Sequence, residues 1–427
     1  MQFIKSYYHL ILAFLGNLLF GFPSRKLFVI GVTGTKGKST VLELINATLE
    51  AAGKRTALLS SVRRKVCAHD AANLSDNTMP GRLAIQGFLK DAVKAKCEFA
   101  LIEVTSQGVT QHRHRFIDWD AAVFINLAPE HIESHGSFEE YREAKVDFFR
   151  YLAKSKKTTK HFFINENDAN HHYFEEAARR VPDAKINFFS RDRFIKEELG
   201  RHYDLRSQAS RRVIGDWLLA DFNLENAAAA VAIARTLRVD WPSIQRALDS
   251  FRGVPGRLEF VQKQPFSVVI DYAHTPDSLE KVYQALDPVA LTPRSGGELI
   301  CVLGSAGGGR DKWKRSAMGK IAATHCSKII LTNEDPYDED PMEIIKEVED
   351  GFLEIDHPRL RPDHYFCVLD RKEAIQKAVS IAKKGDVVVI TGKGSERWIH
   401  VARGKKISWS ERCAVEEALK NTSNKSI

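Results

Sequence analysis

Residue types that could bind phosphate occur early in the chain, in the segment Gly34-Thr35-Lys36-Gly37-Lys38-Ser39-Thr40. Glycines let backbone N–H groups turn toward phosphate oxygens, and the Lys38 ammonium can reach the β- and γ-phosphates. The hydroxyl of Ser39 or Thr40 can bind Mg²⁺. The segment therefore predicts a site for ATP and magnesium.

The residues around this segment support the prediction. An apolar, β-branched run over 27–33 precedes it, and a helical pattern over 38–52 follows it. Strand, Gly-rich turn and helix form the context that a phosphate loop requires. The spacing is tighter than the common Gly-xxxx-Gly-Lys-Ser pattern, and the alternative is a chance cluster of glycines.

Two further residues could hold a metal near this loop. Glu103 ends the apolar run 99–104, and His131 follows the apolar run 121–126. In a parallel sheet the carboxyl ends of the strands face the ligand crevice, so both side chains are expected beside the phosphate loop. Lys145 lies on a predicted helix over 138–152, where a lysine is most often a solvated surface residue.

The elements that position these residues predict two α/β domains. Helix-like stretches separate the buried-strand candidates of the first domain, which is typical of a parallel sheet with helices on both faces. The Gly/Pro-rich stretch 251–257 follows a predicted helix over 241–250 and reads as a hinge. Beyond it, strand candidates at 267–272, 298–304, 328–332, 365–368 and 386–391 predict a doubly wound, Rossmann-like sheet. Two such domains joined by a hinge predict a cleft that closes on substrate.

Composition favours a globular enzyme. The 427 residues are 44% apolar and 28% charged, and the formal net charge is +8. The basic residues are scattered, and no aromatic-and-basic groove pattern indicates nucleic acid. The six cysteines stand singly, without a CxxC pair, and are expected to be reduced thiols in the cytoplasm.

Residues 1–26 form a separate apolar segment. The run 7–22 is short for a spanning helix and contains His9, Gly16 and Asn17. It predicts an amphipathic helix packed on the first domain, and a peripheral anchor at a membrane surface is the alternative.

In combination, these motifs resemble the Mur ligases of peptidoglycan synthesis. The resemblance runs in order from about residue 27 to 420, so the expected domains are a central ATP-binding domain (27–253) and a C-terminal amino-acid-binding domain (254–427). The matching segments are Gly31-Val-Thr-Gly-Thr-Lys-Gly-Lys-Ser-Thr40, Glu103-Val-Thr-Ser-Gln-Gly108, Asn126-Leu-Ala-Pro-Glu-His-Ile-Glu-Ser-His-Gly136, Tyr141-Arg-Glu-Ala-Lys145, Phe222-Asn-Leu-Glu-Asn-Ala-Ala228, Pro255-Gly-Arg-Leu-Glu259, Asp271-Tyr-Ala-His-Thr-Pro276, 304–315, Asp335-Pro-Tyr-Asp-Glu-Asp-Pro341 and Gly392-Lys-Gly-Ser-Glu396.

The resemblance implies roles in the central domain. Lys38 with Ser39 or Thr40 would serve ATP and one Mg²⁺, and Glu103 and His131 a second. Lys145 matches the family lysine that is carbamylated and then ligates metal. The remaining matches are Gly34, Thr35 and Gly37 in the phosphate loop, Thr78 on the acceptor side, and Asn223 and Asn226 on the adenine side.

It also implies roles in the C-terminal domain. Arg257 matches the hinge arginine near ATP, and Asp271, Tyr272 and His274 match the motif that closes over the nucleotide. Residues for the incoming amino acid are Arg310, Asp335, Pro336, Tyr337, Gly392 and Glu396.

The implied reaction joins a carboxylate to an amine. The acceptor carboxylate attacks the γ-phosphate of ATP to give an acyl phosphate and ADP, and the amine of an amino acid then displaces phosphate. Lys38 and two Mg²⁺ would neutralise the charge on the phosphate and carboxylate oxygens. Lys38, Lys145, His131 and Asp271 are the expected catalytic residues.

The sequence also departs from the family pattern. The phosphate loop starts almost at the first residue, so the family's uridine-nucleotide-binding domain is expected to be missing, and a separate protein is one possible source of acceptor binding. Tyr337 stands where diaminopimelate enzymes carry arginine, and it cannot pair with a carboxylate as arginine does. Lysine or another amino acid is therefore as plausible a substrate as diaminopimelate. Ser395 replaces a family histidine.

These departures leave alternatives open. The acceptor could be lipid-linked, a folate or an amino-acid polymer rather than a UDP-linked muramoyl peptide. A non-catalytic ATP-binding scaffold is a further possibility, although the combined presence of Lys38, Glu103, His131, Lys145 and Asp271 argues against it.

Overall fold

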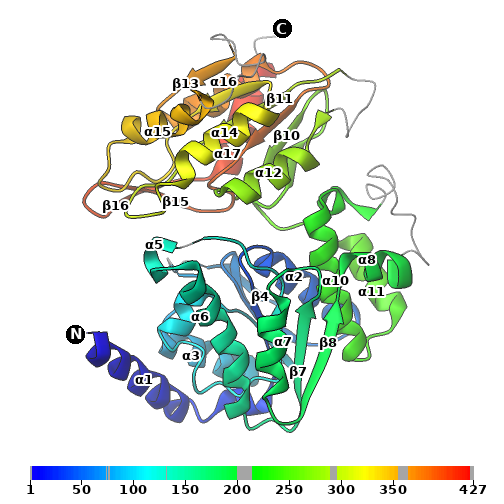
Figure 1. Ribbon diagram of the computed structural model, residues 1–427. Helices are drawn as coiled ribbons and strands as arrows, with labels where there is room; N and C mark the ends of the chain where they lie inside the picture. Colours follow the sequence, from blue (N-terminus) through cyan, green and yellow to red (C-terminus); the bar gives the residue numbers. More distant parts are fainter. Residues whose placement is uncertain are drawn as a thin grey trace. The chain divides into compact units, whose positions relative to one another are not determined.

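The protein is described by a computed structural model that covers residues 2–73, 75, 77–130, 132–199, 214–288, 296–353 and 364–423 (Figure 1). Most of the chain divides into two compact units at residues 251/252, and the second unit also includes described residues within 130–134 and 214–220. This border falls inside the stretch 251–257 that the sequence marks as a hinge.

The described part of the first unit contains an eight-stranded sheet in the order β4-β3-β2-β5-β1-β6-β7-β8. The strands from β2 to β8 in this order run parallel, and β3 and β4 extend the edge in antiparallel fashion. Their bounds are β1 Phe28–Thr33, β2 Thr56–Leu59, β3 Arg63–Val66, β4 His69–Ala72, β5 Phe99–Glu103, β6 Ala121–Phe124, β7 Lys160–Asn165 and β8 Ala184–Phe189.

Helices cover both faces of this sheet. The helices α3, α6 and α7 share one apolar core with the strands, whereas α2 packs with α10 and α11. The helical segments of the first unit are α1 Gln2–Leu19, η1 Pro23–Lys26, α2 Lys38–Ala51, α3 Arg82–Lys94, α4 Ser106–Thr110, α6 Phe138–Tyr151, η2 Leu152–Lys154, α7 His171–Arg179, α8 Arg191–Arg193, η3 Phe194–Glu198, α10 Asp221–Thr236 and α11 Trp241–Ser250. Two short segments, α5 Ile132–His135 and η5 Asp216–Leu218, fall mainly or wholly among the residues assigned to the second unit.

The central strands read as continuous apolar runs because both faces are covered. In β5 every residue is buried, including Glu103 at its end, and β1 is buried from Val29 to Thr33. Such burial fixes the strand ends where the phosphate loop and Glu103 emerge.

The helix expected within 7–22 is present as α1, and it packs against α3 of the same unit (Figure 1). Gly16 allows the close approach, because a Cβ there would lie 3.0 Å from a methyl group of Leu83. No helix in the described part of the chain is long and apolar enough to cross a membrane.

Within its described residues, the second unit contains a six-stranded sheet in the order β13-β12-β11-β14-β10-β9, parallel except for β9. A separate hairpin is formed by β15 and β16. The strand bounds are β9 Glu259–Gln262, β10 Ser267–Ile270, β11 Leu299–Leu303, β12 Lys328–Leu331, β13 Tyr365–Cys367, β14 Val387–Ile390, β15 Trp398–Val401 and β16 Lys405–Ser408.

The helices of this unit complete a doubly wound fold. The helices α16 and α17 share an apolar core with the sheet, and α12, α14 and α15 pack one against the next. Their bounds are α12 Pro276–Ala285, α14 Lys314–His325, α15 Pro341–Leu353, α16 Arg371–Ile381 and α17 Glu411–Ser423. The predicted fold class is therefore confirmed.

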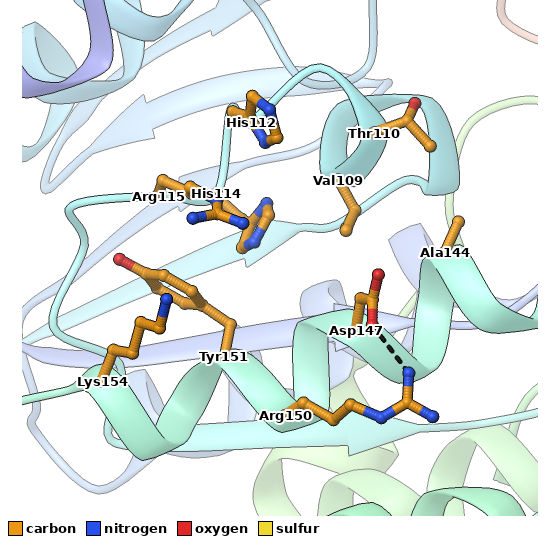
Figure 2. Close-up of a pocket in the computed structure, with 10 residues that line it drawn as sticks. All are labelled: Val109, Thr110, His112, His114, Arg115, Ala144, Asp147, Arg150, Tyr151 and Lys154. Atoms are coloured by element: carbon orange, nitrogen blue, oxygen red, sulfur yellow. Dashed lines mark hydrogen bonds and ion pairs between the residues drawn. The ribbon is translucent and has the colours of Figure 1, made fainter. Parts of the chain in front are cut away.

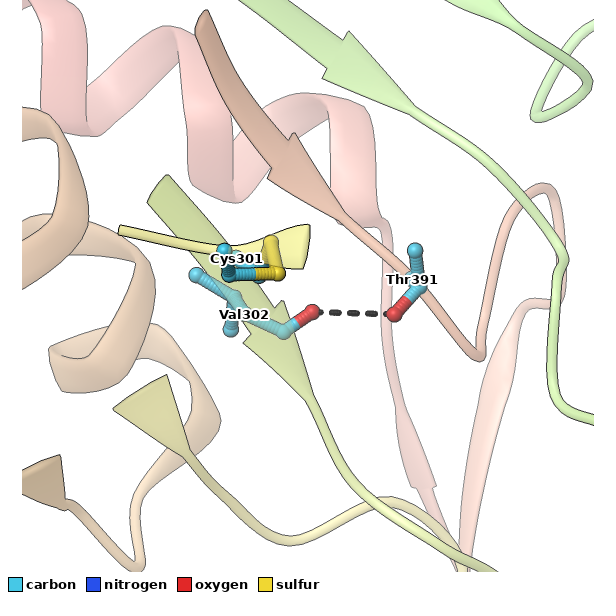
Figure 3. Close-up of a disulfide and its surroundings, with 4 residues drawn as sticks. Cys301, Val302 and Thr391 are labelled. Carbon is cyan, nitrogen blue, oxygen red and sulfur yellow. Dashed lines mark hydrogen bonds between the residues drawn. A yellow bond between two sulfur atoms is a disulfide. The ribbon is translucent and has the colours of Figure 1, made fainter. Parts of the chain in front are cut away.

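The expectation that all cysteines are reduced is wrong for one pair. Cys301 on β11 and Cys326, directly after α14, form a disulfide across 25 positions of sequence (Figure 3). The two cysteines are far apart in sequence and lie in no spaced motif, so the composition gave no signal. Cys326 lies two residues before β12, and the pairing of β12 with β11 is what brings the two sulfur atoms together.

Candidate active site

The phosphate loop between β1 and α2 is held in place by Asn126, two residues after the end of β6. The Asn126 side-chain oxygen accepts hydrogen bonds from the backbone N–H of Thr35 (3.1 Å) and Lys36 (3.0 Å). Its amide nitrogen donates to the Lys36 carbonyl at 3.2 Å. One side chain therefore fixes the conformation of the loop, a role that the sequence did not assign to it.

Gly37 and Asn226 meet at the start of α2. Gly37 has φ +85°, and a Cβ built on it would lie 2.3 Å from the Asn226 side-chain oxygen. Asn226 also donates a 2.9 Å hydrogen bond to Asn223, and both side chains are buried. The structure thus places the expected adenine-side pair against the phosphate loop itself.

Two lysine ammonium groups converge on the carbonyl oxygen of Gly34. Lys38 donates to it at 3.1 Å and to the Thr35 carbonyl at 2.9 Å. Lys145 donates to it at 2.8 Å and is only 2% exposed, so the surface role that a lone helical lysine suggests is wrong here. Its ammonium also lies 4.7 Å from the centre of the Tyr141 ring.

Oxygen atoms suited to magnesium meet beside this cluster. The Ser39 hydroxyl donates a 2.9 Å hydrogen bond to the Glu103 carboxylate, and the Lys38 ammonium lies 3.9 Å from the other Glu103 oxygen. Ser61 also donates its backbone N–H to Glu103. A buried carboxylate and a hydroxyl are ligands that Mg²⁺ prefers, so this pair fits the ion.

The second expected metal site is only partly visible. His131 lies outside the described residues, and those residues contain no cluster of three His, Cys, Asp or Glu side chains that could hold a metal. Glu103 and Lys145 are the described members of the expected set. A metal site here would therefore depend on His131 and on a changed Lys145 side chain.

Two polar residues that the sequence did not single out, Tyr141 and His135, also lie near the phosphate loop. The Tyr141 hydroxyl lies 3.0 Å from the Thr35 hydroxyl. The His135 ring nitrogen lies 3.1 Å from the Ser106 hydroxyl. Burial and the nearby charge of Lys145 lower the pKa of His135, which keeps this ring neutral near pH 7.

Two other predicted residues take supporting positions. Thr40 is buried within the first turn of α2, and Thr78 is half-buried in the segment that precedes α3. Neither position tests the role that the family resemblance implies.

The predicted nucleotide-closing motif of the second unit is well anchored. The Asp271 carboxylate accepts 2.7 Å hydrogen bonds from the backbone N–H of Leu258 and of Ala273. The Arg257 guanidinium stacks 4.0 Å from the centre of the Tyr272 ring. His274 Nδ1 lies 2.7 Å from the Tyr272 carbonyl. Asp271 therefore braces the chain that carries Arg257, Tyr272 and His274.

A buried lysine links the residues expected to receive the amino acid. Lys393, which is 0% exposed, donates to Asp335 at 2.9 Å and to Glu396 at 2.6 Å. Glu396 also accepts a 2.8 Å hydrogen bond from the Tyr272 hydroxyl. Burial acts to lower the pKa of Lys393, but the carboxylates of Glu396 and Asp335 outweigh it and raise that pKa.

Arg310 and Tyr337 form a second contact in this region. Arg310 donates a 3.1 Å hydrogen bond to the Tyr337 hydroxyl, and the Tyr337 ring stacks on His400 with centroids 5.1 Å apart. Burial acts to lower the pKa of Arg310, but Tyr337, Tyr272 and nearby carboxylates raise it overall. Arg310 therefore stays a cation next to an aromatic pair.

Glu334 lies beneath the predicted glycine of this site. A Cβ on Gly392 would lie 2.4 Å from one Glu334 oxygen, and that oxygen has no hydrogen-bond partner among the described residues. Burial and the charge of Asp335 raise the pKa of Glu334. Gly392 is thus required for this close approach to Glu334. The other predicted residue, Pro336, follows Asp335 in the loop after β12.

An ion pair that the sequence did not reveal supports the same loop. Arg371 and Glu411 are both almost fully buried and pair with each other at the starts of α16 and α17. Arg371 also donates to the carbonyls of Asn333 and Thr391. It thereby ties together the ends of β12 and β14, from which the predicted amino-acid residues emerge.

The first unit has the parallel sheet and phosphate loop of an ATP-using enzyme, and the second has a Rossmann-like sheet. Comparison with protein families matches residues 32–234 to the Mur ligase middle domain and residues 256–394 to the Mur ligase, glutamate ligase domain. The chain belongs to the Mur ligase family. It is accordingly an ATP-dependent, amide-bond-forming ligase of peptidoglycan precursor synthesis.

Individual relatives agree with this assignment. The chain is 34% identical, over 94% of its length and 80% of the relative, to UDP-N-acetylmuramoyl-L-alanyl-D-glutamate–2,6-diaminopimelate ligase from Halalkalibacterium halodurans. A solved structure of a ligase with that name shares 28% identity and a TM-score of 0.58, covering 93% of this chain and 79% of that one. Folylpolyglutamate synthase from Mycobacterium tuberculosis shares the fold at 16% identity, with a TM-score of 0.66, 92% of this chain covered and 96% of that one.

Proposed function

We propose that this ligase adds one amino acid to the carboxylate of a muramoyl-peptide acceptor through an acyl phosphate, in the cytoplasm. The observation that carries the proposal is the meeting of Lys38 and Lys145 at the Gly34 carbonyl. Lys38 brings a positive charge to the phosphate loop, and the buried Lys145 lies where a carbamylated side chain would hold magnesium. Both suit a reaction in which negative charge collects on phosphate and carboxylate oxygens. The relatives named above supply the acceptor class.

The residues of the first unit have distinct tasks in this proposal. Backbone N–H groups of the loop and the Lys38 ammonium bind the β- and γ-phosphates of ATP. Ser39 and Glu103 would hold one Mg²⁺, and Glu103, His131 and a carbamylated Lys145 a second. Bound magnesium would supply neutralisation of phosphate charge. Thr78 would orient the acceptor, and Asn223 and Asn226 would support the adenine side.

The residues of the second unit receive the amino acid. The Arg310 cation would bind its α-carboxylate, while Asp335 and Glu396 would accept hydrogen bonds from its amino group. Tyr337 offers an aromatic ring and a hydroxyl where a guanidinium would be needed for a second carboxylate. We therefore propose that lysine is used at least as well as diaminopimelate.

Phosphate release by the purified protein tests the proposal. ATP and Mg²⁺ are supplied with UDP-muramoyl-dipeptide and either lysine or diaminopimelate, and the product is weighed by mass spectrometry. We expect release that needs both acceptor and amino acid, with a mass increase equal to one amide-linked residue. Turnover of ATP that ignores the acceptor would contradict the proposal.

Lys145→Ala separates a ligase from an ATP-binding scaffold. We expect turnover to fall by about a hundredfold or more, since an electrostatic group aimed at transition-state charge is typically worth that much. ATP binding, measured by calorimetry, should persist because the phosphate loop keeps Lys38. A protein that binds ATP and never turns it over with any acceptor would favour the scaffold.

A different acceptor is the second candidate function. The exposed apolar residues of α1 (Ile11, Phe14, Leu15, Leu18 and Leu19) recur at helical spacing and form one stripe. The basic residues Arg25 and Lys26 follow in η1. We propose that this stripe, called the α1 stripe below, rests on an anionic bilayer surface, which would suit a lipid-linked acceptor. The alternative occupant of the α1 stripe is a partner protein, and a test of binding to lipid vesicles distinguishes the two.

A further inference from the structure

A pocket of about 230 Å³ opens in the first unit between the turn after α4 and the outer side of α6 (Figure 2). Most polar side chains that line it are cationic or imidazole groups, and its acidic lining residue is Asp147. The basic and imidazole residues are His112, His114, Arg115, Arg150 and Lys154. None of them was placed in the site for ATP or the amino acid.

Two of these positive charges have no counter-charge. Arg150 is neutralised, because it pairs with Glu143 and with Asp147 at 2.7 Å each. Arg115 and Lys154 make no ion pair in the described chain. The Arg115 Nε atom is also buried without a hydrogen-bond partner among those residues. The pocket thus presents a net positive charge and unused donors.

A buried imidazole adds a further unsatisfied group. His114 is 3% exposed, and its Nδ1 atom has no hydrogen-bond partner within the described residues. Burial, reinforced by the charge of Arg115, lowers the pKa of His114 to about 3, so the ring is neutral at pH 7. Buried polar atoms normally find a partner, and an orphan at a pocket wall indicates a missing ligand.

The size of the pocket limits what it can hold. Pockets for drug-sized ligands measure roughly 300–1,000 Å³, so this smaller pocket suits one charged group rather than a whole nucleotide. Two uncompensated cations together with neutral donors match the charge of a phosphate or diphosphate. We propose that Arg115, Lys154 and His114 bind a diphosphate group.

The position of the pocket along α6 suggests whose diphosphate it is. Ala144 lines the pocket, and the next residue, Lys145, reaches the phosphate loop. Lys154 lies nine residues farther along, roughly 14 Å at helical rise. In an acceptor of the UDP-muramoyl-peptide class, the amino sugar and the peptide separate the diphosphate from the reacting carboxylate. If the chain has the proposed function, the pocket holds the diphosphate of the acceptor, whether that diphosphate is linked to uridine or to a lipid.

Binding of inorganic pyrophosphate tests the pocket without any catalysis. Calorimetry with the full chain compares wild type, Arg115→Gln, the double variant Arg115→Gln/Lys154→Gln and Lys156→Gln. Lys156 is an exposed lysine two residues beyond Lys154 and lies outside the pocket lining, so it is the matched control. The phosphate loop is first saturated with a non-hydrolysable ATP analogue so that pyrophosphate cannot bind there, and thermal melting checks that each variant is folded.

We expect the double variant to lose about tenfold or more in pyrophosphate affinity, with a smaller loss for the single variant and none for the control. Equal affinity in wild type and double variant would overturn the site, as would an equal loss in Lys156→Gln. This result does not depend on ligase activity, so it stands apart from the proposed function.

Kinetics then test the source of the diphosphate. With UDP-muramoyl-dipeptide, Arg115→Gln should raise KM about tenfold at little change in kcat. With muramoyl-dipeptide that lacks the diphosphate, wild type and variant should share one KM. If pyrophosphate binding is lost but neither KM changes, the site takes free phosphate compounds and the link to the acceptor is wrong. A lipid-linked acceptor that alone shows the KM effect would identify the lipid as the carrier.

Discussion

At the residue scale, Gly37 shows how closely the phosphate loop fits its surroundings. Its φ of +85° lies in the left-handed region, and an added Cβ would lie 2.3 Å from the Asn226 oxygen. Gly37→Ala should therefore both strain the backbone and displace Asn226. We expect ATP affinity to fall at least about tenfold, measured by calorimetry, since a methyl group at the loop also obstructs its approach to phosphate.

Gly53 offers a matched control at the other end of α2. It has φ +75°, but no atom lies within 4 Å of its Cβ position. Gly53→Ala should lower the free energy of unfolding by about 1–2 kcal/mol through backbone strain alone and leave ATP affinity unchanged. Equal losses of ATP affinity in both variants would show that strain, and not the contact with Asn226, sets the result.

The residues of the site could be predicted only in part from the sequence. Glu103 ends a strand and Lys38 begins the helix after the phosphate loop, and the order of strand, loop and helix was enough to place them. Lys393 and Arg371 act through partners far away in sequence: Lys393 pairs with Asp335, and Arg371 with Glu411. Spacing along the chain carries no signal for such pairs, because they depend on which strand ends become neighbours in the folded sheet.

At the scale of elements, α1 is a helix with one buried and one exposed side. Ala13 and Asn17 are buried, whereas Leu15 and Leu18 are 42% and 52% exposed. Vesicles with anionic lipids should sediment the wild-type chain. The triple variant Ile11→Gln/Leu15→Gln/Leu18→Gln should bind at least about tenfold more weakly, because each apolar side chain contributes roughly 1 kcal/mol or more on burial.

Ile407 provides a control for the vesicle-binding experiment on α1. It lies on β16 in the second unit and is 54% exposed, so Ile407→Gln removes the exposed apolar surface of one comparable residue elsewhere. Vesicle binding should be unchanged in this variant. Failure of wild type to bind vesicles, together with stable association of another protein that the triple variant loses, would assign the α1 stripe to a partner protein.

Two of the strands that the sequence missed are exposed, although it also missed the buried strands β2 and β7. The apolar runs at 99–104 and 328–332 became β5 and β12 with ends shifted by one residue. The sequence did not predict β4 or β16, whose residues are all exposed. Edge and hairpin strands such as these form through pairing with a neighbour, and polar side chains give them no apolar pattern that reasoning from a single sequence could detect.

At the scale of the whole molecule, the disulfide makes the two units respond differently to a reductant. Cys301 and Cys326 lie in the second unit, whereas the free thiols Cys67 and Cys97 lie in the first. Scanning calorimetry should show two unfolding transitions. Reduction should lower the temperature of only the transition that belongs to the second unit. The free energy of unfolding of that unit should fall by about 3 kcal/mol, because a cross-link across a loop of this length restricts the unfolded chain by that order.

The double variant Cys301→Ala/Cys326→Ala assigns the transitions. It should unfold at the lowered temperature with or without reductant, while Cys367→Ala, which removes an exposed free thiol, should behave as wild type. Reductant sensitivity that survives in the double variant would show that another group is responsible.

The position of the disulfide has a consequence for how its state changes with time. Cys301 is 0% and Cys326 is 2% exposed, so small thiols can reach neither sulfur while the second unit stays folded. Exchange must then wait for that unit to open, whatever the surrounding redox potential favours. Two batches of the same protein that folded under different conditions would therefore keep different covalent structures side by side, and each would record the conditions of its own folding.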